Sequence, residues 1–113
     1  MARAPTKLLS LAGALLFVAL ATANAAGYRY GASDQAFYIP AFVRAIDPSA
    51  FPRDGLLIDA QARLMALDEI VGAIVRITGL SLQAVSAGGY ILSLLLIWVA
   101  LLRIRGSVYG TSW

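Results

Sequence analysis

Two long apolar stretches without a charged residue constrain this chain more than any other feature. They run from Leu8 to Tyr28 and from Ile77 to Leu102, and each exceeds the roughly 20 residues that a helix needs to cross a hydrocarbon core about 30 Å thick. Of the 113 residues, 60% are hydrophobic and 13% are charged, against about 45–50% and about 25% in soluble domains. The sequence therefore predicts an all-α membrane protein in which two transmembrane helices form a hairpin.

Basic residues flank the two stretches and predict their orientation. Arg3 and Lys7 precede the first stretch, and Arg103 and Arg105 follow the second. Because Lys and Arg accumulate on the cytoplasmic side of membrane helices, we expect a multi-pass protein of the plasma (inner) membrane with both ends cytoplasmic. The predicted order is a cytoplasmic N-terminus over 1–7, a first transmembrane helix over 8–28, an extracytoplasmic segment over 29–76, a second transmembrane helix over 77–102 and a cytoplasmic tail over 103–113.

The first stretch has a second interpretation. A basic start, an apolar run and the ending Ala23-Asn24-Ala25 are also the layout of a secretory signal peptide, in which an Ala-x-Ala element marks the cleavage site. The sequence leaves both alternatives open, an uncleaved first helix and a signal removed after Ala25. Both place the residues after Gly27 outside the cytoplasm.

The first half of the extracytoplasmic segment combines helix and turn signals. Pro40 is suited to the first turn of a short helix that ends at Ile46. The following Asp47-Pro48 should stop this helix, because the residue before proline is pushed out of the α region. Pro52-Arg53-Asp54-Gly55 predicts a turn. We therefore expect a short helix and a turn before residue 56.

The second half of the segment has helical periodicity. Apolar residues at three- and four-residue spacing predict one amphipathic helix over about 56–76, which lies on the outer leaflet or packs against the rest of a larger protein. Asp59 and Arg63 are four residues apart and can pair on its surface. The predicted apolar face consists of Leu57, Ala60, Leu64, Leu67, Val71 and Ile74.

The composition excludes several kinds of chemistry. The chain has no cysteine and no histidine, so it lacks disulfides, thiolate metal sites and the commonest general base and zinc ligand. Its net charge is +3, but the basic residues form no patch with interleaved aromatic residues, and nucleic acid is not a predicted partner. The predicted partner is the lipid bilayer, and neither a cofactor nor a metal is predicted.

Asp34 is the one candidate catalytic residue. It follows the first stretch by a few residues and should lie at the outer membrane surface, where a carboxylate could bind a metal or act as a base on a lipid-linked substrate. The structural alternative is a helix N-cap, for which Ser33 and Asp34 are both favoured. By contrast, Asp68 and Glu69 are adjacent and point about 100° apart on a helix, which is poor geometry for a shared substrate.

The stretch from Gly27 to Asp54 carries a family resemblance. A tyrosine-rich loop leads to Asp34 and then to an Asp-Pro-x-x-Phe-Pro-x-Asp element at 47–54. This arrangement resembles the N-terminal region of a mostly uncharacterised group of bacterial polytopic membrane proteins, similar in layout to GT-C-type glycosyltransferases. The resemblance covers residues 8–113. It implies a polyprenyl-phosphate-linked sugar as partner and Asp34 as the catalytic acid of the first external loop, although no second acid lies beside it.

Two function hypotheses follow. Members of the resembled group have many spans, so the resemblance implies that this chain is the N-terminal part of a longer protein, truncated in its cytoplasmic tail and inactive by itself. The full-length protein would then be a lipid-linked-sugar glycosyltransferase. The alternative is a small non-catalytic membrane protein, or scaffold, whose segment 29–76 contacts partners. The sequence does not decide whether the protein is an enzyme.

Overall fold

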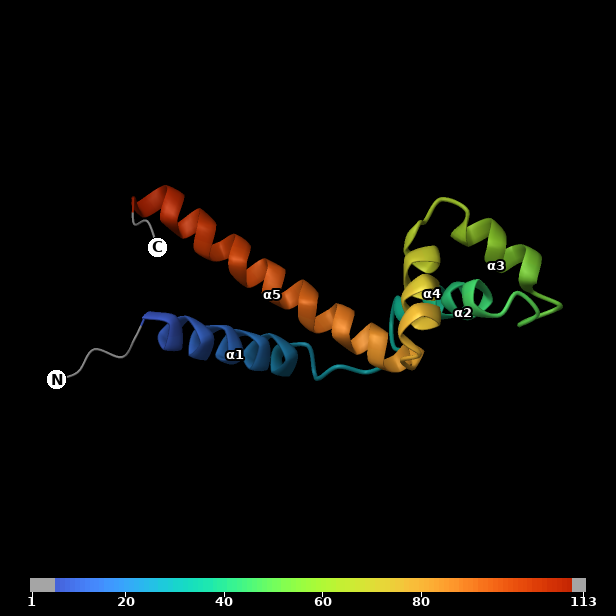
Figure 1. The fold of residues 1–113 in the computed structure, drawn as a ribbon, viewed down its shortest axis with the longest axis horizontal. Coiled ribbons are helices and arrows are strands. Elements are labelled where there is room, and N and C mark those ends of the chain that lie inside the picture. The colour runs from blue at the N-terminus through green and yellow to red at the C-terminus, as the bar shows by residue number, and fades with distance from the viewer. Residues whose placement is uncertain (1–5, 111–113) are drawn as a thin grey trace. The chain divides into compact units, whose positions relative to one another are not determined.

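The computed structural model describes residues 6–110, and within this range the chain consists of α-helices without a β-strand (Figure 1). The predicted all-α class is confirmed. Residues 29–87 form one compact unit, and α1 with the larger part of α5 forms another. The helices are α1 (Thr6–Asn24), α2 (Gln35–Ile46), α3 (Gly55–Ala62), α4 (Leu67–Thr78) and α5 (Leu82–Tyr109).

Helix α5 is the best candidate for a membrane span. It has 28 residues, and over Leu82–Val108 it is long and apolar enough to cross a membrane; no other helix between residues 6 and 110 meets both conditions. The apolar part of α1, Leu8–Asn24, is shorter. Length and composition thus support one membrane span, and the predicted two-span hairpin is not confirmed by them.

The first apolar stretch, Leu8–Tyr28, continues past the end of the helix that it forms. Helix α1 ends at Asn24, because Ala26 and Gly27 have left-handed backbones with φ values of 57° and 86°. The Ala26 N–H donates to the Ala23 carbonyl at 3.1 Å, and the Gly27 N–H donates to the Thr22 carbonyl at 2.9 Å. These two bonds form a Schellman motif, which satisfies the last carbonyls of a helix. Tyr28 therefore lies outside α1.

The second predicted stretch contains the end of one helix and most of another. Gly79 has a left-handed backbone with φ 69°, and its N–H donates to the Val75 carbonyl at 2.9 Å. This C-cap ends α4 at Thr78, so Ile77 belongs to α4 and α5 begins only at Leu82. Helix α5 also continues past the predicted boundary at Leu102 and ends at Tyr109.

Helix α2 is longer than predicted but ends where predicted. It begins at Gln35, so Pro40 lies inside the helix rather than in its first turn. The end at Ile46 is confirmed: Asp47 has an extended backbone, with φ −130° and ψ 97°, as expected before a proline. Residues 52–54 form the predicted turn, and Gly55 is already the first residue of α3.

The prediction of one helix over 56–76 is wrong. The chain turns between Ala62 and Leu67, where the Met65 N–H donates to the Ala62 carbonyl at 2.8 Å. No glycine or proline lies in this turn, so local propensity does not explain it. Tertiary packing does, because both α3 and α4 contact α2. The predicted apolar face is split as a result: Val71 is half-buried, whereas Leu64 is 97% exposed.

The core of the Arg29–Ala87 unit is small. Its buried hydrophobic side chains are those of Ala41, Phe42 and Ala62. A Cβ atom on Gly72 would lie 3.1 Å from the Ala45 Cβ and 3.4 Å from the Ala45 carbonyl carbon. The backbones of α2 and α4 therefore approach closely at this crossing, and any side chain at position 72 would be tight against Ala45.

Candidate functional site

Asp34 occupies the N-cap position of α2 without capping it. Its backbone is helical, with φ −60° and ψ −24°, and its side chain makes no capping hydrogen bond. An N-cap residue normally has a β-region backbone, which aims its side-chain oxygen at the free N–H groups of the helix. The neighbouring Gln35 side chain binds the loop before α2, where its Oε1 accepts a hydrogen bond from the Gly31 N–H at 3.0 Å. The Asp34 side chain is exposed, and its carboxylate is not used for helix capping.

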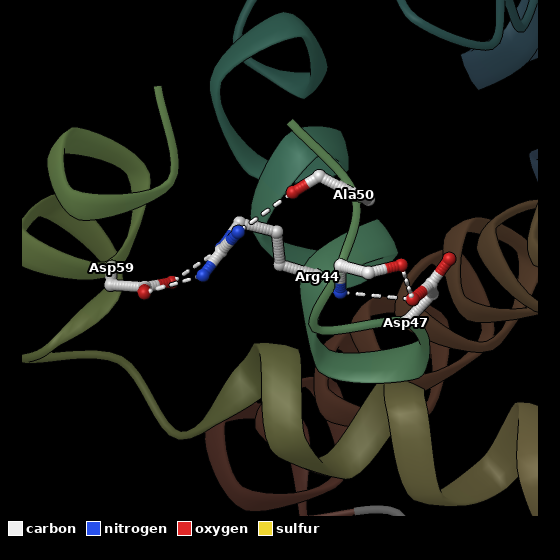
Figure 2. Close-up of polar contacts among 5 residues, drawn as sticks. Arg44, Asp47, Ala50 and Asp59 are labelled. Carbon is white, nitrogen blue, oxygen red and sulfur yellow. Dashed lines mark hydrogen bonds and ion pairs between the residues drawn. The ribbon is translucent and has the colours of Figure 1, made fainter. Parts of the chain in front are cut away.

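Asp47 stabilises the turn that follows α2. Its Oδ1 accepts hydrogen bonds from the Ser49 hydroxyl at 2.6 Å and from the Ser49 N–H at 2.9 Å (Figure 2). These bonds hold the pKa of Asp47 below its usual 3.8, the hydroxyl bond having the larger effect. In the Asp-Pro-x-x-Phe-Pro-x-Asp element, the first aspartate therefore orders the turn backbone.

Arg44 connects the end of α2 with the turn and with α3. Its Nε and Nη2 donate to the two carboxylate oxygens of Asp59 at 2.7 and 2.8 Å, and its Nη1 donates to the Ala50 carbonyl at 2.7 Å (Figure 2). A two-pronged Arg–carboxylate pair fixes both distance and direction. The Arg44 side chain is 17% exposed and that of Asp59 is 55% exposed. The predicted pairing of Asp59 with Arg63 is wrong, because α3 turns Asp59 toward α2.

Gly55 completes this arrangement, which we call the Arg44 cluster (Arg44, Ala50, Gly55 and Asp59). A Cβ atom on Gly55 would lie 2.5 Å from the Arg44 Nη1 and 2.8 Å from its Cζ. The guanidinium thus fills the space that any larger residue at position 55 would need. Because Gly55 is the first residue of α3, this contact also fixes where α3 starts relative to α2.

We expect the Arg29–Ala87 unit to lose stability in acid. The hydrogen bonds from Arg44 lower the pKa of Asp59, as Ser49 lowers the pKa of Asp47, both from 3.8. A carboxylate with a depressed folded-state pKa contributes stability that is complete well above its unfolded pKa and is lost as the pH falls through its folded pKa. Unfolding of the unit, followed by amide hydrogen exchange in nanodiscs, should become easier below about pH 4.

The variant Asp59→Asn tests the cause of this acid sensitivity. It should destabilise the unit near neutral pH and flatten the dependence on pH, because the group that titrates is gone. Ser49→Ala is the matched variant for Asp47, whose carboxylate would lose the bond from the Ser49 hydroxyl. A pH profile that is unchanged in Asp59→Asn would contradict the assignment to the Arg44–Asp59 pair.

Helix α4 is held to α2 by a second arginine. Arg76 donates from its Nη1 to the Ala45 carbonyl near the C-terminus of α2, where a cation also interacts favourably with the helix dipole. Asp68 is half-buried and its Oδ1 has no hydrogen-bond partner, whereas Glu69 is exposed. Across residues 6–110, no cluster of three or more acidic side chains that could hold a metal ion is present.

Helices α1 and α5 contact each other through aromatic side chains in antiparallel order. A Cβ atom on Gly13 would lie 3.0 Å from the Trp98 indole, and the rings of Phe17 and Trp98 are 5.4 Å apart. Further along α1, the Tyr90 hydroxyl donates to the Thr22 Oγ1 at 3.1 Å. The Tyr28 ring lies 5.0 Å from that of Tyr90. Residues later in α1 thus contact residues earlier in α5, so the two helices run antiparallel.

Sequence reasoning singled out Asp34 but missed the residues that organise the unit. The closest contacts of the unit involve Arg44, Gly55, Gly72 and Arg76. The hydrogen bonds of the two arginines reach residues that are 6 to 31 positions away along the chain. No local pattern indicates such pairs. Pro52 and Gly55 did predict the turn before α3. They did not predict that the Arg44 guanidinium lies against Gly55.

Comparison with known protein families, curated proteins and solved structures finds no match to this chain. The resemblance of Gly27–Asp54 to membrane glycosyltransferases therefore stays a prediction. What the structure adds is a local role for two of its elements: residues 47–54 connect α2 to α3, and Asp34 precedes α2 with an exposed carboxylate.

Proposed function

We propose that this chain is an integral membrane protein in which α1 and α5 form an antiparallel transmembrane hairpin that holds the Arg29–Ala87 unit outside the cytoplasm as a non-catalytic scaffold. The observation that carries this proposal is the set of contacts between the two helices, Gly13 and Phe17 with Trp98 and Thr22 with Tyr90. Small residues that admit a large one, together with an interhelical hydrogen bond, are typical of helix packing in membranes.

The same contacts favour an uncleaved α1 over a removed signal peptide. Cleavage after Ala25 would take away the partners of Trp98 and the acceptor of the Tyr90 hydroxyl. A hydroxyl without a partner in a hydrocarbon environment is costly. The apolar part of α1, Leu8–Asn24, is about 26 Å long at 1.5 Å per residue, a few Å shorter than the hydrocarbon core. A small mismatch of this size is absorbed by local thinning of the bilayer.

A scaffold role is supported by how the unit uses its polar and apolar groups. The carboxylates of Asp47 and Asp59 are bound to Ser49 and Arg44, so they maintain the fold. Several large apolar side chains are directed to the surface, among them Phe37 at 71% and Leu56 at 89% exposed. Exposed apolar patches commonly mark protein or membrane contacts.

Cysteine labelling tests the topology, because the chain has no cysteine of its own. Arg53→Cys lies in the exposed turn before α3, and Ser107→Cys lies near the end of α5. A membrane-impermeant maleimide should label Arg53→Cys on intact cells and Ser107→Cys only after lysis. The mature protein should also keep its residues before Ala26. Labelling of Ser107→Cys from outside, or a mature chain that starts at Ala26, would contradict the hairpin.

A second candidate function is transfer of a polyprenyl-phosphate-linked sugar with Asp34 as the catalytic carboxylate. One observation favours it: the Asp34 side chain is exposed and makes no capping hydrogen bond. A carboxylate that is not committed to the fold is available as a general base. The positional match of Asp34 in the resembled glycosyltransferases supports the same role.

The variant Asp34→Asn tests this second function. Transfer of a radiolabelled sugar from a polyprenyl-phosphate donor should be abolished while membrane insertion is kept. Glu69→Gln is the matched control, since Glu69 is an exposed acid of the same unit. Unchanged transfer by Asp34→Asn would remove Asp34 from catalysis, and no transfer by the parent protein would leave the scaffold function.

A further inference from the structure

Helix α4 carries an apolar stripe that no other helix of its unit covers. Leu67, Ile70, Ile74 and Ile77 follow one another at three- and four-residue spacing, which places them on one face of a helix. Their exposed fractions are 51%, 54%, 39% and 84%. We call these four residues the α4 stripe. Four large aliphatic side chains in one continuous row are more than the scattered apolar residues of an ordinary surface.

The α4 stripe faces away from α2. At about 100° per residue, Gly72 lies roughly 180° around the helix from the middle of the stripe. Gly72 is buried against Ala45, and Arg76 donates to the Ala45 carbonyl. The packed side of α4 and the positive charge of Arg76 are therefore both directed toward α2, and the stripe itself carries no charged residue.

The chain keeps the α4 stripe close to the start of α5. Only Gly79, Leu80 and Ser81 separate the two helices, so Ile77 lies within about 18 Å of Leu82 even if the connection is fully extended. The Leu80 side chain in this connection is itself 52% exposed. Apolar exposure thus continues from the stripe toward the span.

The length of α5 places this connection at the membrane surface. From Leu82 to Leu102 the helix is free of charge, a length of about 31 Å at 1.5 Å per residue. This equals the thickness of a hydrocarbon core, about 30 Å. When Arg103 stands at the cytoplasmic boundary, Leu82 stands at the outer boundary, and the α4 stripe is tethered within reach of the outer headgroup layer.

We infer that α4 lies on the outer leaflet, with the α4 stripe inserted among lipid headgroups and the adjoining acyl chains. This inference rests on the proposed membrane hairpin and adds a second lipid contact to it. Interfacial helices bury their apolar face about 5–10 Å into this layer, a depth that aliphatic side chains on one helix face can reach. We assign lipid to the α4 stripe because the short connection to α5 keeps the stripe close to the lipid headgroups in every inserted molecule.

Site-directed fluorescence in nanodiscs of phosphatidylcholine tests this inference on the whole chain. A bimane probe is attached to Ile70→Cys or Ile74→Cys on the stripe, to Glu69→Cys as the matched neighbour off the stripe, and to Leu96→Cys within α5. Discs are made with ordinary or with bromine-labelled acyl chains. The probes at 70 and 74 should emit at shorter wavelength than the probe at 69 and should be quenched by the bromine-labelled lipid.

The controls separate failure of the inference from failure of the hairpin. If the probe on Leu96→Cys is quenched and those on Ile70→Cys and Ile74→Cys are quenched no more than that on Glu69→Cys, the lipid contact of α4 is refuted and the membrane span stands. Short-wavelength emission at 70 and 74 without quenching would show that protein rather than lipid covers the α4 stripe, and this would also refute the inference. An unquenched probe at 96 would overturn both the inference and the proposed function.

Discussion

Replacing Gly72 with leucine should separate α4 from α2 and unfold much of the Arg29–Ala87 unit. A Cβ atom at position 72 already approaches the Ala45 Cβ to 3.1 Å and the Ala45 carbonyl to 3.4 Å, and leucine adds three further carbons to this crossing. Overpacking of this kind costs about 1–3 kcal/mol. Because the buried hydrophobic side chains of the unit are only those of Ala41, Phe42 and Ala62, little other packing compensates.

Hydrogen exchange of the α2 and α4 amides in nanodiscs measures this effect. Protection should fall in both helices of Gly72→Leu. Gly88→Leu is the matched control, because it makes the same substitution inside a helix where nothing lies within 4 Å of the added Cβ. Equal protection in the two variants would mean that the α2–α4 crossing does not stabilise the unit.

Replacing Leu92 with arginine should strongly impair membrane insertion of α5. Leu92 lies midway between Leu82 and Leu102, and its side chain is 57% exposed, so the new charge would face acyl chains. An arginine in place of a leucine at the centre of a span makes insertion less favourable by about 3 kcal/mol, roughly 100-fold. The flanking Arg103 would not reduce this cost, because it lies more than about 15 Å away along the helix.

A quantitative insertion assay in inner-membrane vesicles checks this expectation. Leu64→Arg provides the control, since Leu64 lies between α3 and α4 and is 97% exposed. The control should insert like the parent chain, whereas Leu92→Arg should be depleted from the alkali-resistant membrane fraction. Equal insertion of both variants would show that α5 does not cross the hydrocarbon core.

Helix type was predictable here, but helix boundaries were predictable only where a local signal set them. Asp47-Pro48 ended α2 at Ile46 as expected, because a residue before proline is restricted by its own neighbour. The end of α4 at Thr78 depends on the left-handed Gly79, which is hidden in sequence inside a long apolar run. The turn between α3 and α4 has no local cause at all, since it follows from packing of both helices on α2.

The candidate site, too, was predictable only where a local signal determined it. The position of Asp34 before α2 follows from the chain order, and capping was a fair expectation for an aspartate at a helix start. Its failure to cap depends on a helical backbone at Asp34 that the left-handed Ser33, with φ 54°, leads into. The pairing of Arg44 with Asp59 joins residues 15 positions apart, and spacing alone favoured Arg63 instead.

The contact between Arg44 and Gly55 has an evolutionary consequence. Because the guanidinium occupies the place of a side chain at position 55, a change at either position alters what the other can accept. A larger residue at 55 expels the guanidinium and thereby breaks its bonds to Asp59 and Ala50, whereas a short residue at 44 leaves room for it. The two positions are thus epistatic, and in diverging copies of this gene they should change together, with the substitution at 44 coming first.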